Sequence, residues 1–395
     1  MARLALGAAL GFILLATLTP FPGEHQPDFV GCLICGIRGN SDAVVNLILY
    51  LPLGAALMIN GRTGLGAVGI AGLLSAGIEF MQIFIPGRDP SLGDVCFNTL
   101  GAAVGHAVAQ VLVHWGAPET RIAARLSVVA ALAAVGVFAL TGWLLSPALP
   151  ASAFRAWYTT DRSNLELYRG RVLSTTLGSV PFGPADLPDP HETRRLLLGG
   201  APLRILAVAG PRVRGLGPLF VVEDEWGDEI YLVGPDRDDL VLRYRTRATA
   251  LRLDQPDLRL RHAFAHVAAG DTLNIEVIRE GHGYCLTSNR DRACGVGYTV
   301  GSGWGLLLYP RHFPPWLKTL LSTGWVAGLA VPAGFWARRR WESGLAGILL
   351  LTGVGVVPSI VRLLPTPLWQ WLGVGAGVSL GIGLQILARR VRPSR

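Results

Sequence analysis

Acidic and amide side chains recur at helical spacing inside two segments that are otherwise strongly apolar. Glu79 and Gln82 lie three residues apart, and Asp94 and Asn98 lie four residues apart. Residues at these separations share one face of a helix. Carboxylates beside amides can hold a hard cation or act as a general acid and base. Because ionisable groups at membrane depth cost a few kcal/mol each, the pattern predicts a functional site.

An earlier segment and a connecting loop add three residues to this predicted site. Asp42 and Asn46 repeat the spacing of an acid and an amide four residues apart. Arg88 lies in the loop Pro86–Pro90 at the aqueous boundary, where a guanidinium suits a phosphate or carboxylate ligand. The predicted catalytic residues are Glu79, Arg88 and Asp94, and the predicted ligand-binding residues are Asp42, Asn46, Gln82 and Asn98. A divalent cation held by the carboxylates is left open.

Helix packing is the alternative explanation for these polar residues. Amides hydrogen-bond routinely between membrane helices, and each bond contributes roughly 0.5–2 kcal/mol. Packing explains Asn46, Gln82 and Asn98 well, but it explains three carboxylates poorly. One arginine neutralises one of them, and the other two must be protonated, hydrated or bound to a cation. Gly101 and Gly105 are ordinary close-packing positions for helices and are given no chemistry.

Membrane-spanning helices are needed to position these residues. The chain has 395 residues, of which 51% are hydrophobic and 16% charged, and its mean hydropathy is +0.42. This composition is typical of a polytopic membrane protein, whose environment is the lipid bilayer. A hydrocarbon core of roughly 30 Å needs about 20 apolar residues per helix. Suitable runs predict eight transmembrane helices, at about residues 4–20, 43–60, 64–85, 94–113, 122–146, 316–337, 344–364 and 367–388.

A polar region at about residues 151–315 interrupts the series of predicted helices. It contains short runs of alternating polarity, such as Leu203–Val208 and Leu240–Arg245, bounded by turn residues. Alternation with a period of two predicts half-buried strands, and the region is long enough to bury a core of its own. We therefore predict a β-sandwich of the jelly-roll, concanavalin-like type between the fifth and sixth transmembrane helices.

The polar residues at these spacings resemble the VanZ-like family. The residues that carry the resemblance are Asp42-x-x-x-Asn46 with Leu51-Pro52-Leu53-Gly54, then Ile78-Glu79-x-x-Gln82-x-Phe84-x-x-Gly87-Arg88, then Asp94-x-x-x-Asn98-Thr99-Leu100-Gly101. The resemblance covers about residues 1–115 and implies a small polytopic domain of four helices. The family is named for a protein associated with resistance to the glycopeptide teicoplanin, and its activity is not well defined. The remaining predicted parts are a fifth transmembrane helix in 116–150, the sandwich in 151–315, and three helices with a basic cytoplasmic tail in 316–395.

The polar region carries a second resemblance, to laminin-G or concanavalin-like jelly rolls fused to VanZ-like domains. Its residues run from Phe220 to Arg247 and continue at Asp271–Val277. Such sandwiches often bind glycans, sometimes with calcium, whose ligands are oxygen atoms. The candidate oxygen ligands are Asp236, Asp238 and Asp239. The alternative, which is favoured, is a solvated turn between two strands.

Arginine positions predict the orientation of the helices. The net charge is +8, but the arginines lie at helix ends and not along an aromatic-interleaved face, so no nucleic-acid partner is expected. One side of an eight-helix arrangement carries Arg3, Arg62, Arg121, Arg125, Arg338, Arg339, Arg340, Arg389, Arg390, Arg392 and Arg395. Arg38 and Arg88 lie on the other side. The positive-inside rule then predicts a multi-pass cell-membrane protein with both termini in the cytoplasm and with residues 151–315 and the carboxylates outside.

The cysteines agree with an exported polar region. Cys285 and Cys294 are nine residues apart across a polar turn, and a disulfide is predicted between them. Cys32 and Cys35 lie in the first outward loop, where a disulfide and free thiols are both left open. A metal or redox role for this pair is less favoured, because no second ligand pair accompanies it. Cys96 is left unpaired.

Two functions of different classes fit the sequence. In the first, an outward-facing site binds or modifies an anionic or phosphorylated lipid, or a lipid-linked envelope precursor. In the second, the protein is a non-catalytic scaffold whose exported sandwich binds envelope glycan, and the polar residues only hold helices together. The residue types do not decide whether the protein is an enzyme. A covalent serine or cysteine mechanism is disfavoured, because no Ser/His or Cys/His pair is evident near the carboxylates.

Overall fold

The computed structural model describes residues 2–20, 31–115, 119–162, 165–184, 189–311 and 313–391. Contacts between these residues divide the chain into two compact units. The first unit is Met1–Leu126 with Leu251–Asp254 and Leu306–Leu308, and the second unit is Ser127–Ala250, Gln255–Gly305 and Tyr309–Arg395. Arg392 and Arg395, which entered the predicted orientation, lie outside the described residues.

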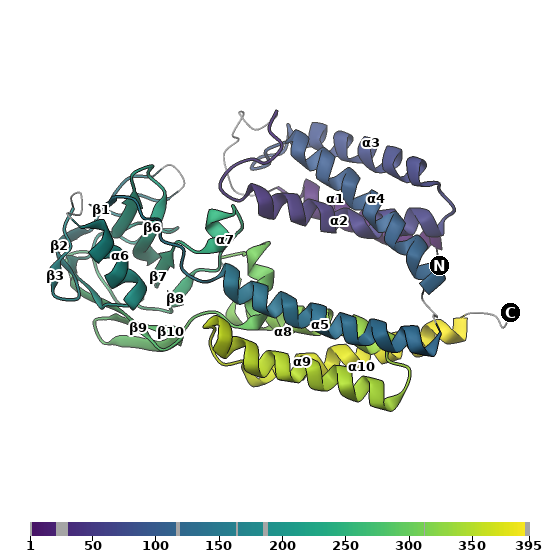
Figure 1. The fold of residues 1–395 in the computed structure, drawn as a ribbon. Helices are drawn as coiled ribbons and strands as arrows, with labels where there is room; N and C mark the ends of the chain where they lie inside the picture. Colours follow the sequence, from purple (N-terminus) through teal and green to yellow (C-terminus); the bar gives the residue numbers. More distant parts are fainter. Residues whose placement is uncertain are drawn as a thin grey trace. The chain divides into compact units, whose positions relative to one another are not determined.

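The first unit contains four apolar helices (Figure 1). They are α1 (Ala2–Leu18), α2 (Gly39–Ile59), α3 (Gly64–Gln82) and α4 (Leu92–Trp115). Glycines allow α2 and α4 to approach closely, because a Cβ atom placed on Gly54 would overlap the carbonyl oxygen of Ala102. A Cβ on Gly105 would likewise overlap the carbonyl oxygen of Leu51. The prediction that Gly105 is a close-packing position is therefore confirmed, and the contact fixes the two helices that carry most of the predicted site.

The start of α2 is held by two segments that come much later in the chain. The backbone N–H of Asn40 donates to the carbonyl oxygen of Arg252 at 3.2 Å. The Ser41 hydroxyl donates to the carbonyl oxygen of Leu306 at 2.8 Å, although the two residues are 265 positions apart. Arg38 also pairs with Asp254 at 3.5 Å. These contacts satisfy backbone and side-chain groups at a helix start that has no side-chain cap of its own.

The second unit contains the other long helices. They are most of α5 (Thr120–Leu144), then α8 (Pro315–Trp336), α9 (Arg340–Val361) and α10 (Leu368–Val391). Among the residues that the structure describes, six helices are long and apolar enough to cross a membrane: α2, α3, α4, α5, α9 and α10. Helix α1, with 17 residues, is shorter, and α8 is not among the six. The predicted polytopic helical fold is confirmed, and six of the eight predicted spans are supported by this measure.

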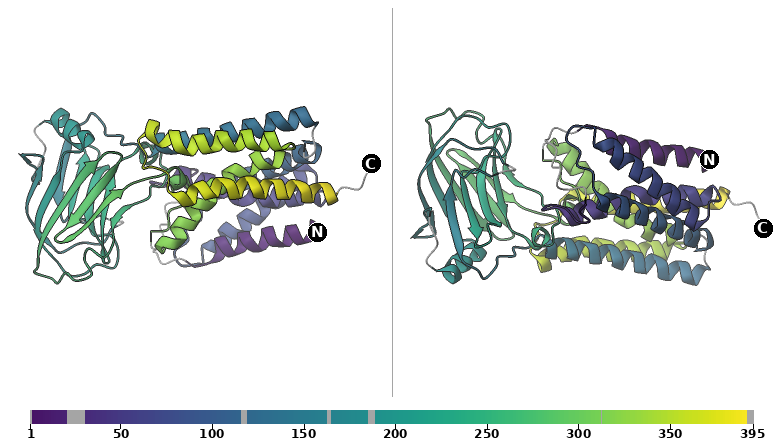
Figure 2. Two further views of the ribbon diagram at one scale, coloured as in Figure 1. Left: turned by 90° about the horizontal axis from the view of Figure 1, so that it is seen from below. Right: turned by 90° about the horizontal axis from the view of Figure 1, so that it is seen from above.

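Two antiparallel sheets make up the strand region of the second unit (Figure 2). In spatial order, the first sheet contains β1 (Phe154–Tyr158), β5 (Phe220–Asp224), β6 (Glu229–Asp236), β7 (Asp239–Tyr244) and β8 (Leu258–Leu260). The second contains β11 (Asp291–Val296), β10 (Gly283–Ser288), β9 (Thr272–Glu280), β4 (Leu203–Val208), β2 (Arg171–Leu177) and β3 (Val180–Pro181). Tyr244 of the first sheet contacts Tyr284 of the second, with ring centroids 5.4 Å apart. The two sheets therefore face each other as a β-sandwich.

The two runs used to predict strands differ in burial. Strand β4 alternates between more and less buried residues, as predicted from its sequence. Strand β7 is buried on both faces for most of its length. The physical reason is a small apolar cluster on the outer face of the first sheet. In this cluster, Leu216 from a loop packs with Val221, Leu232 and Val241. Covering the outer face of the first sheet in this way removes the alternation of exposure that the pattern predicted.

Both cysteine pairs form disulfides. Cys285 in β10 is bonded to Cys294 in β11, which confirms the predicted bond, and Cys32 is bonded to Cys35. Cys96 is a free, exposed cysteine. The Cys32–Cys35 loop lies against the start of α4, because the backbone N–H of Gly93 donates to the carbonyl oxygen of Cys32 at 3.1 Å. A Cβ on Gly93 would overlap the carbonyl oxygen of Leu33.

Candidate functional site

Ser91 links the two carboxylates at the centre of the predicted site. Its backbone N–H donates to Glu79 Oε2 at 2.9 Å, and its hydroxyl lies 3.1 Å from Asp94 Oδ1. The same hydroxyl accepts a hydrogen bond from the backbone N–H of Asp94, the geometry of a serine that caps the start of a helix. A carboxylate in the first turn is also favoured by the helix dipole. The cap of α4 thus brings Asp94 beside Glu79, a buried residue near the end of α3.

Helix α2 contributes an amide and a third carboxylate. The Asn46 side chain is hydrogen-bonded to Asp94. Asp42, one turn earlier, is within electrostatic range of both Asp94 and Arg38, and its side chain is more exposed. Asn46 of α2, Glu79 of α3 and Asp94 of α4 therefore come together, with Asp42 at the edge of the group.

Two buried polar atoms in this group are poorly paired within the described part of the chain. The Asn98 amide donates to the Ser75 hydroxyl at 2.9 Å, but Asn98 Oδ1 accepts no hydrogen bond from any described residue. The Tyr50 hydroxyl interacts with Ser75 but makes no hydrogen bond of normal geometry to a described residue, although Tyr50 is fully buried. Unpaired buried polar atoms are rare in native structures, and each calls for an explanation. We define the polar cluster as Asn46, Tyr50, Ser75, Glu79, Ser91, Asp94 and Asn98.

Tyr50, Ser75 and Ser91 were not predicted from the sequence. Tyr50 follows Asn46 by four residues on α2, so the helical spacing that linked Asp42 to Asn46 could have found it. Its ring, however, is typical of an apolar span. Ser91 acts on Glu79 through its backbone N–H, which has no signal in the pattern of side chains.

Gln82 and Arg88 lie at the end of α1 and bind its backbone. The Gln82 amide donates to the carbonyl oxygen of Thr17 at 2.9 Å. Arg88 donates through Nε to the carbonyl oxygen of Thr19 at 3.0 Å and through Nη2 to that of Ala16 at 2.7 Å. The last carbonyls of a helix have no partners within the helix and form the negative end of its dipole, so an amide and a cation are favoured there. Both side chains therefore contribute to helix packing, and Arg88 also interacts electrostatically with Glu79.

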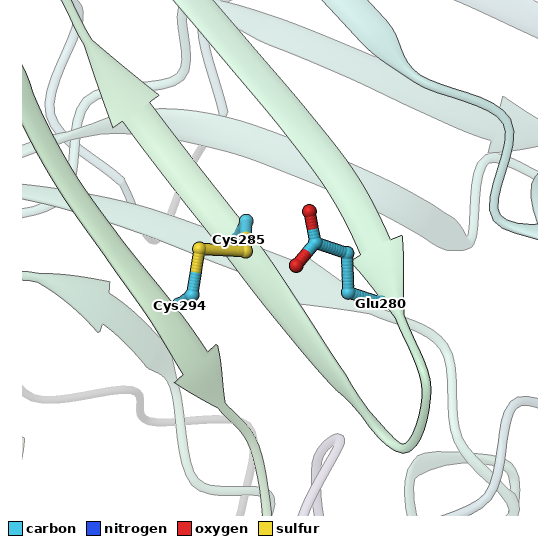
Figure 3. Close-up of side chains that lie close together, drawn as sticks. All are labelled: Glu280, Cys285 and Cys294. Atoms are coloured by element: carbon cyan, nitrogen blue, oxygen red, sulfur yellow. A yellow bond between two sulfur atoms is a disulfide. The ribbon is translucent and has the colours of Figure 1, made fainter.

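A second group of side chains in the sandwich has the composition of a metal site. Glu280, Cys285 and Cys294 offer ligand atoms within 4.8 Å of one another (Figure 3). The two sulfur atoms are bonded to each other. Thiolates, and not disulfide sulfurs, are the usual ligands of zinc and related metals. This group is therefore not a metal site while the disulfide is intact.

The aspartates considered as calcium ligands are bound by arginines. Asp236 and Asp239 flank the turn between β6 and β7, as the favoured alternative predicted, but both are buried. Arg259 contacts Asp236 at 2.6 Å and Asp239 at 3.3 Å. Asp238 is paired with Arg212 at 3.4 Å. The turn therefore belongs to a network of ion pairs, and its carboxylates already have cationic partners.

The geometry of the first unit defines a class of protein, a polytopic helical membrane protein with an acid-and-amide cluster between three of its helices. The family model described as VanZ/LLP1 matches residues 10–113. This part of the chain is therefore VanZ-like, which confirms the resemblance seen in its polar motifs. Neither the curated proteins nor the solved structures gave a match to the chain.

Proposed function

We propose that the polar cluster binds the polar head of a phosphorylated lipid or lipid-linked envelope precursor. The observation that carries the proposal is that, among the described residues, buried Asn98 Oδ1 has no hydrogen-bond donor and buried Tyr50 Oη has only a poorly aligned contact with Ser75, in the same cluster as two carboxylates. An acceptor such as Asn98 Oδ1 needs a donor, which a hydroxyl or amino group of a ligand supplies. Packing alone gives no reason to bury these atoms unpaired, because each costs about 1–3 kcal/mol.

The residues divide the chemistry between them. Glu79 and Asp94, joined through Ser91, can accept hydrogen bonds from the head group, hold a bridging divalent cation, or exchange a proton with the ligand. Arg88 supplies positive charge beside Glu79, where it favours a ligand phosphate. Its contacts with α1 hold the guanidinium in place. Gln82 keeps α3 against α1 and has a positioning role.

Binding by full-length protein in nanodiscs tests this function. We expect the Glu79→Gln/Asp94→Asn double variant to bind a polyprenyl phosphate at least about tenfold more weakly than the wild type, since it removes the carboxyl groups that accept hydrogen bonds from the head group or hold a bridging cation. Tyr50→Phe, which removes only a hydroxyl, should weaken binding severalfold. Native mass spectrometry of the retained polyprenyl phosphate measures both effects. Asp89→Asn is the matched control, because Asp89 is an exposed carboxylate in the loop Pro86–Pro90 beside Arg88. This variant should bind as the wild type does.

Folding is measured separately, because the alternative function makes a different prediction. If the protein is a scaffold and the cluster only packs helices, the double variant should keep its melting temperature and should retain polyprenyl phosphate to the same extent as the wild type. A folded double variant with undiminished binding would therefore contradict the proposal. The proposed kinship of the sandwich with laminin-G or concanavalin-like domains, and its binding of envelope glycan, belong to that alternative.

We also propose the orientation derived from the arginines, with both termini in the cytoplasm and the sandwich outside the cell membrane. Arg338 and Arg339 lie between α8 and α9, and Arg340 is the first residue of α9, so by the positive-inside rule this connection is cytoplasmic. Reporter fusions provide the measurement. A cytoplasm-active reporter after Arg340 should be active, and an export-dependent reporter after Ser152, before β1, should be active. The reverse pattern at either position excludes this orientation.

A further inference from the structure

A cavity of about 430 Å³ lies within the second unit, where the sandwich meets the ends of α5 and α9. Residues of the strands, of their turns and of the short helices α6 (Pro190–Gly199) and α7 (Arg247–Ala250) line one side, and residues 142–143, 145–147 and 360–363 line the other. Hydrogen bonds hold the two sides together. The backbone N–H of Arg247 donates to the carbonyl oxygen of Ser146 at 3.1 Å, and that of Leu364 donates to the carbonyl oxygen of Tyr298 at 2.8 Å. The volume lies within the range of small-molecule sites, roughly 300–1,000 Å³.

The cavity has a strongly positive lining. Arg247, Arg279, Arg362 and His282 line it, and no aspartate or glutamate is among its described lining residues. Arg279 lies on β9 opposite Tyr284 of β10. Its guanidinium donates to the carbonyl oxygen of Leu198 at 3.2 Å, and it forms no ion pair with any carboxylate in the described part of the chain. A partly buried arginine without a counter-ion favours an anionic ligand.

Other lining groups are suited to the same ligand. Burial raises the pKa of Tyr284 to about 12, although Arg279 opposes the shift, so its hydroxyl keeps its proton and can donate a hydrogen bond at neutral pH. Arg247 is held over the ring of Trp143 at 5.2 Å and hydrogen-bonds to the Ser146 hydroxyl. His282 Nδ1 hydrogen-bonds to the carbonyl oxygen of Leu363, which fixes the imidazole at the rim.

The helix side of the cavity is mostly apolar, apart from Ser146 and Arg362. Trp143, near the end of α5, is 48% exposed, and Ile360, near the end of α9, is 72% exposed. Helices α5 and α9 are both long and apolar enough to cross a membrane. Their ends therefore lie near the boundary between hydrocarbon and head groups, where tryptophan is enriched. The cavity thus joins a cationic side on the sandwich to an apolar side at the depth of lipid.

We propose that this cavity binds the head-group phosphate of an anionic phospholipid from the adjacent leaflet. Arg279 and Arg247 contact the phosphate, Tyr284 donates a hydrogen bond to it, and the acyl chains lie over Trp143 and Ile360. The site is independent of the polar cluster in the first unit. Its consequence is that an anionic lipid holds the sandwich against the helices of its own unit.

Lipid retention by the full-length protein tests the proposal. We use vesicles of equal parts phosphatidylglycerol and phosphatidylcholine, detergent extraction and native mass spectrometry. The wild type should retain phosphatidylglycerol in preference to phosphatidylcholine. Arg279→Gln should reduce the ratio of the two retained lipids about tenfold. Tyr284→Phe, which keeps the ring and the fold, should lose severalfold and provides the test if Arg279→Gln does not fold. Arg204→Gln is the matched control on the outer face of the same sheet, where Arg204 is 57% exposed, and should behave as wild type.

Competition with inorganic phosphate separates a lipid from a soluble anion. Millimolar phosphate should leave the retained phosphatidylglycerol in place, because it lacks the acyl chains. Displacement of the lipid by phosphate would overturn the assignment to a lipid. Equal retention by the wild type and by folded Arg279→Gln and Tyr284→Phe would overturn the site, as would a wild type without preference for the anionic lipid.

Discussion

Replacing Gly105 with leucine is expected to prevent stable packing of α2 against α4. The Cβ alone would overlap the carbonyl oxygen of Leu51, so the two backbones must separate before any larger side chain fits. Overpacking commonly costs about 1–3 kcal/mol, and here the obstacle is backbone, so we expect a loss of at least about 3 kcal/mol. The measurement is the unfolding free energy of the reconstituted protein, together with its yield from the membrane.

Gly69→Leu is the matched control for this substitution. Gly69 lies in the interior of α3, and a Cβ placed there meets no atom within 4 Å. The change of residue is the same, so its effect reports only helix propensity and lipid contact, and it should be small. Equal stability of the two variants would show that the close approach of α2 and α4 does not limit folding.

The substitution Asp257→Asn is expected to destabilise the sandwich by about 3–5 kcal/mol, the usual range for removing one partner of a buried ion pair. The Asp257 side chain is 1% exposed and contacts Arg243 at 2.6 Å, Arg259 at 2.9 Å and Arg311 at 3.3 Å. Without the carboxylate, less negative charge remains to offset the mutual repulsion of these guanidinium groups. Thermal or denaturant unfolding measures the change. The control is the exposed aspartate Asp228, which pairs with Arg245 at 3.3 Å. Asp228→Asn should lower the unfolding free energy only slightly.

The same carboxylate predicts how the stability depends on pH. Burial alone would raise the pKa of Asp257, but Arg243, Arg311 and Arg259 outweigh burial and hold the pKa well below its usual range. A carboxyl group with a depressed pKa in the folded state stabilises the fold fully above its unfolded pKa of about 4. That stability is lost as pH falls below this value. The wild type should therefore lose more unfolding free energy than Asp257→Asn between about pH 5 and pH 2, and parallel pH profiles would contradict the assignment.

The sequence could predict the helices and the grouping of polar residues on one face of each helix, because both depend on local periodicity. Long apolar runs have few alternatives to membrane helices, and spacings of three and four residues place side chains on one face. The contacts of those side chains with other segments could not be predicted from local periodicity. The contact of Arg88 with the end of α1 depends on how a loop folds back on an earlier helix. The burial of both faces of β7 depends on Leu216, which lies in a loop without periodic pattern.

The contacts between the start of α2 and the later segments have a consequence for the biosynthesis of the protein. Helix α2 leaves the ribosome long before Arg252 and Leu306, the residues whose carbonyl oxygens bind Asn40 and Ser41. The VanZ-like helices can enter the membrane in order, but the contacts at the start of α2, near Asp42, cannot all form until the chain has been made as far as Leu306. Closing so long a loop is slow, since contacts between distant residues form late. The nascent protein therefore passes through a stage in which its membrane helices are inserted while the region around Asp42 is still open to chaperones and proteases.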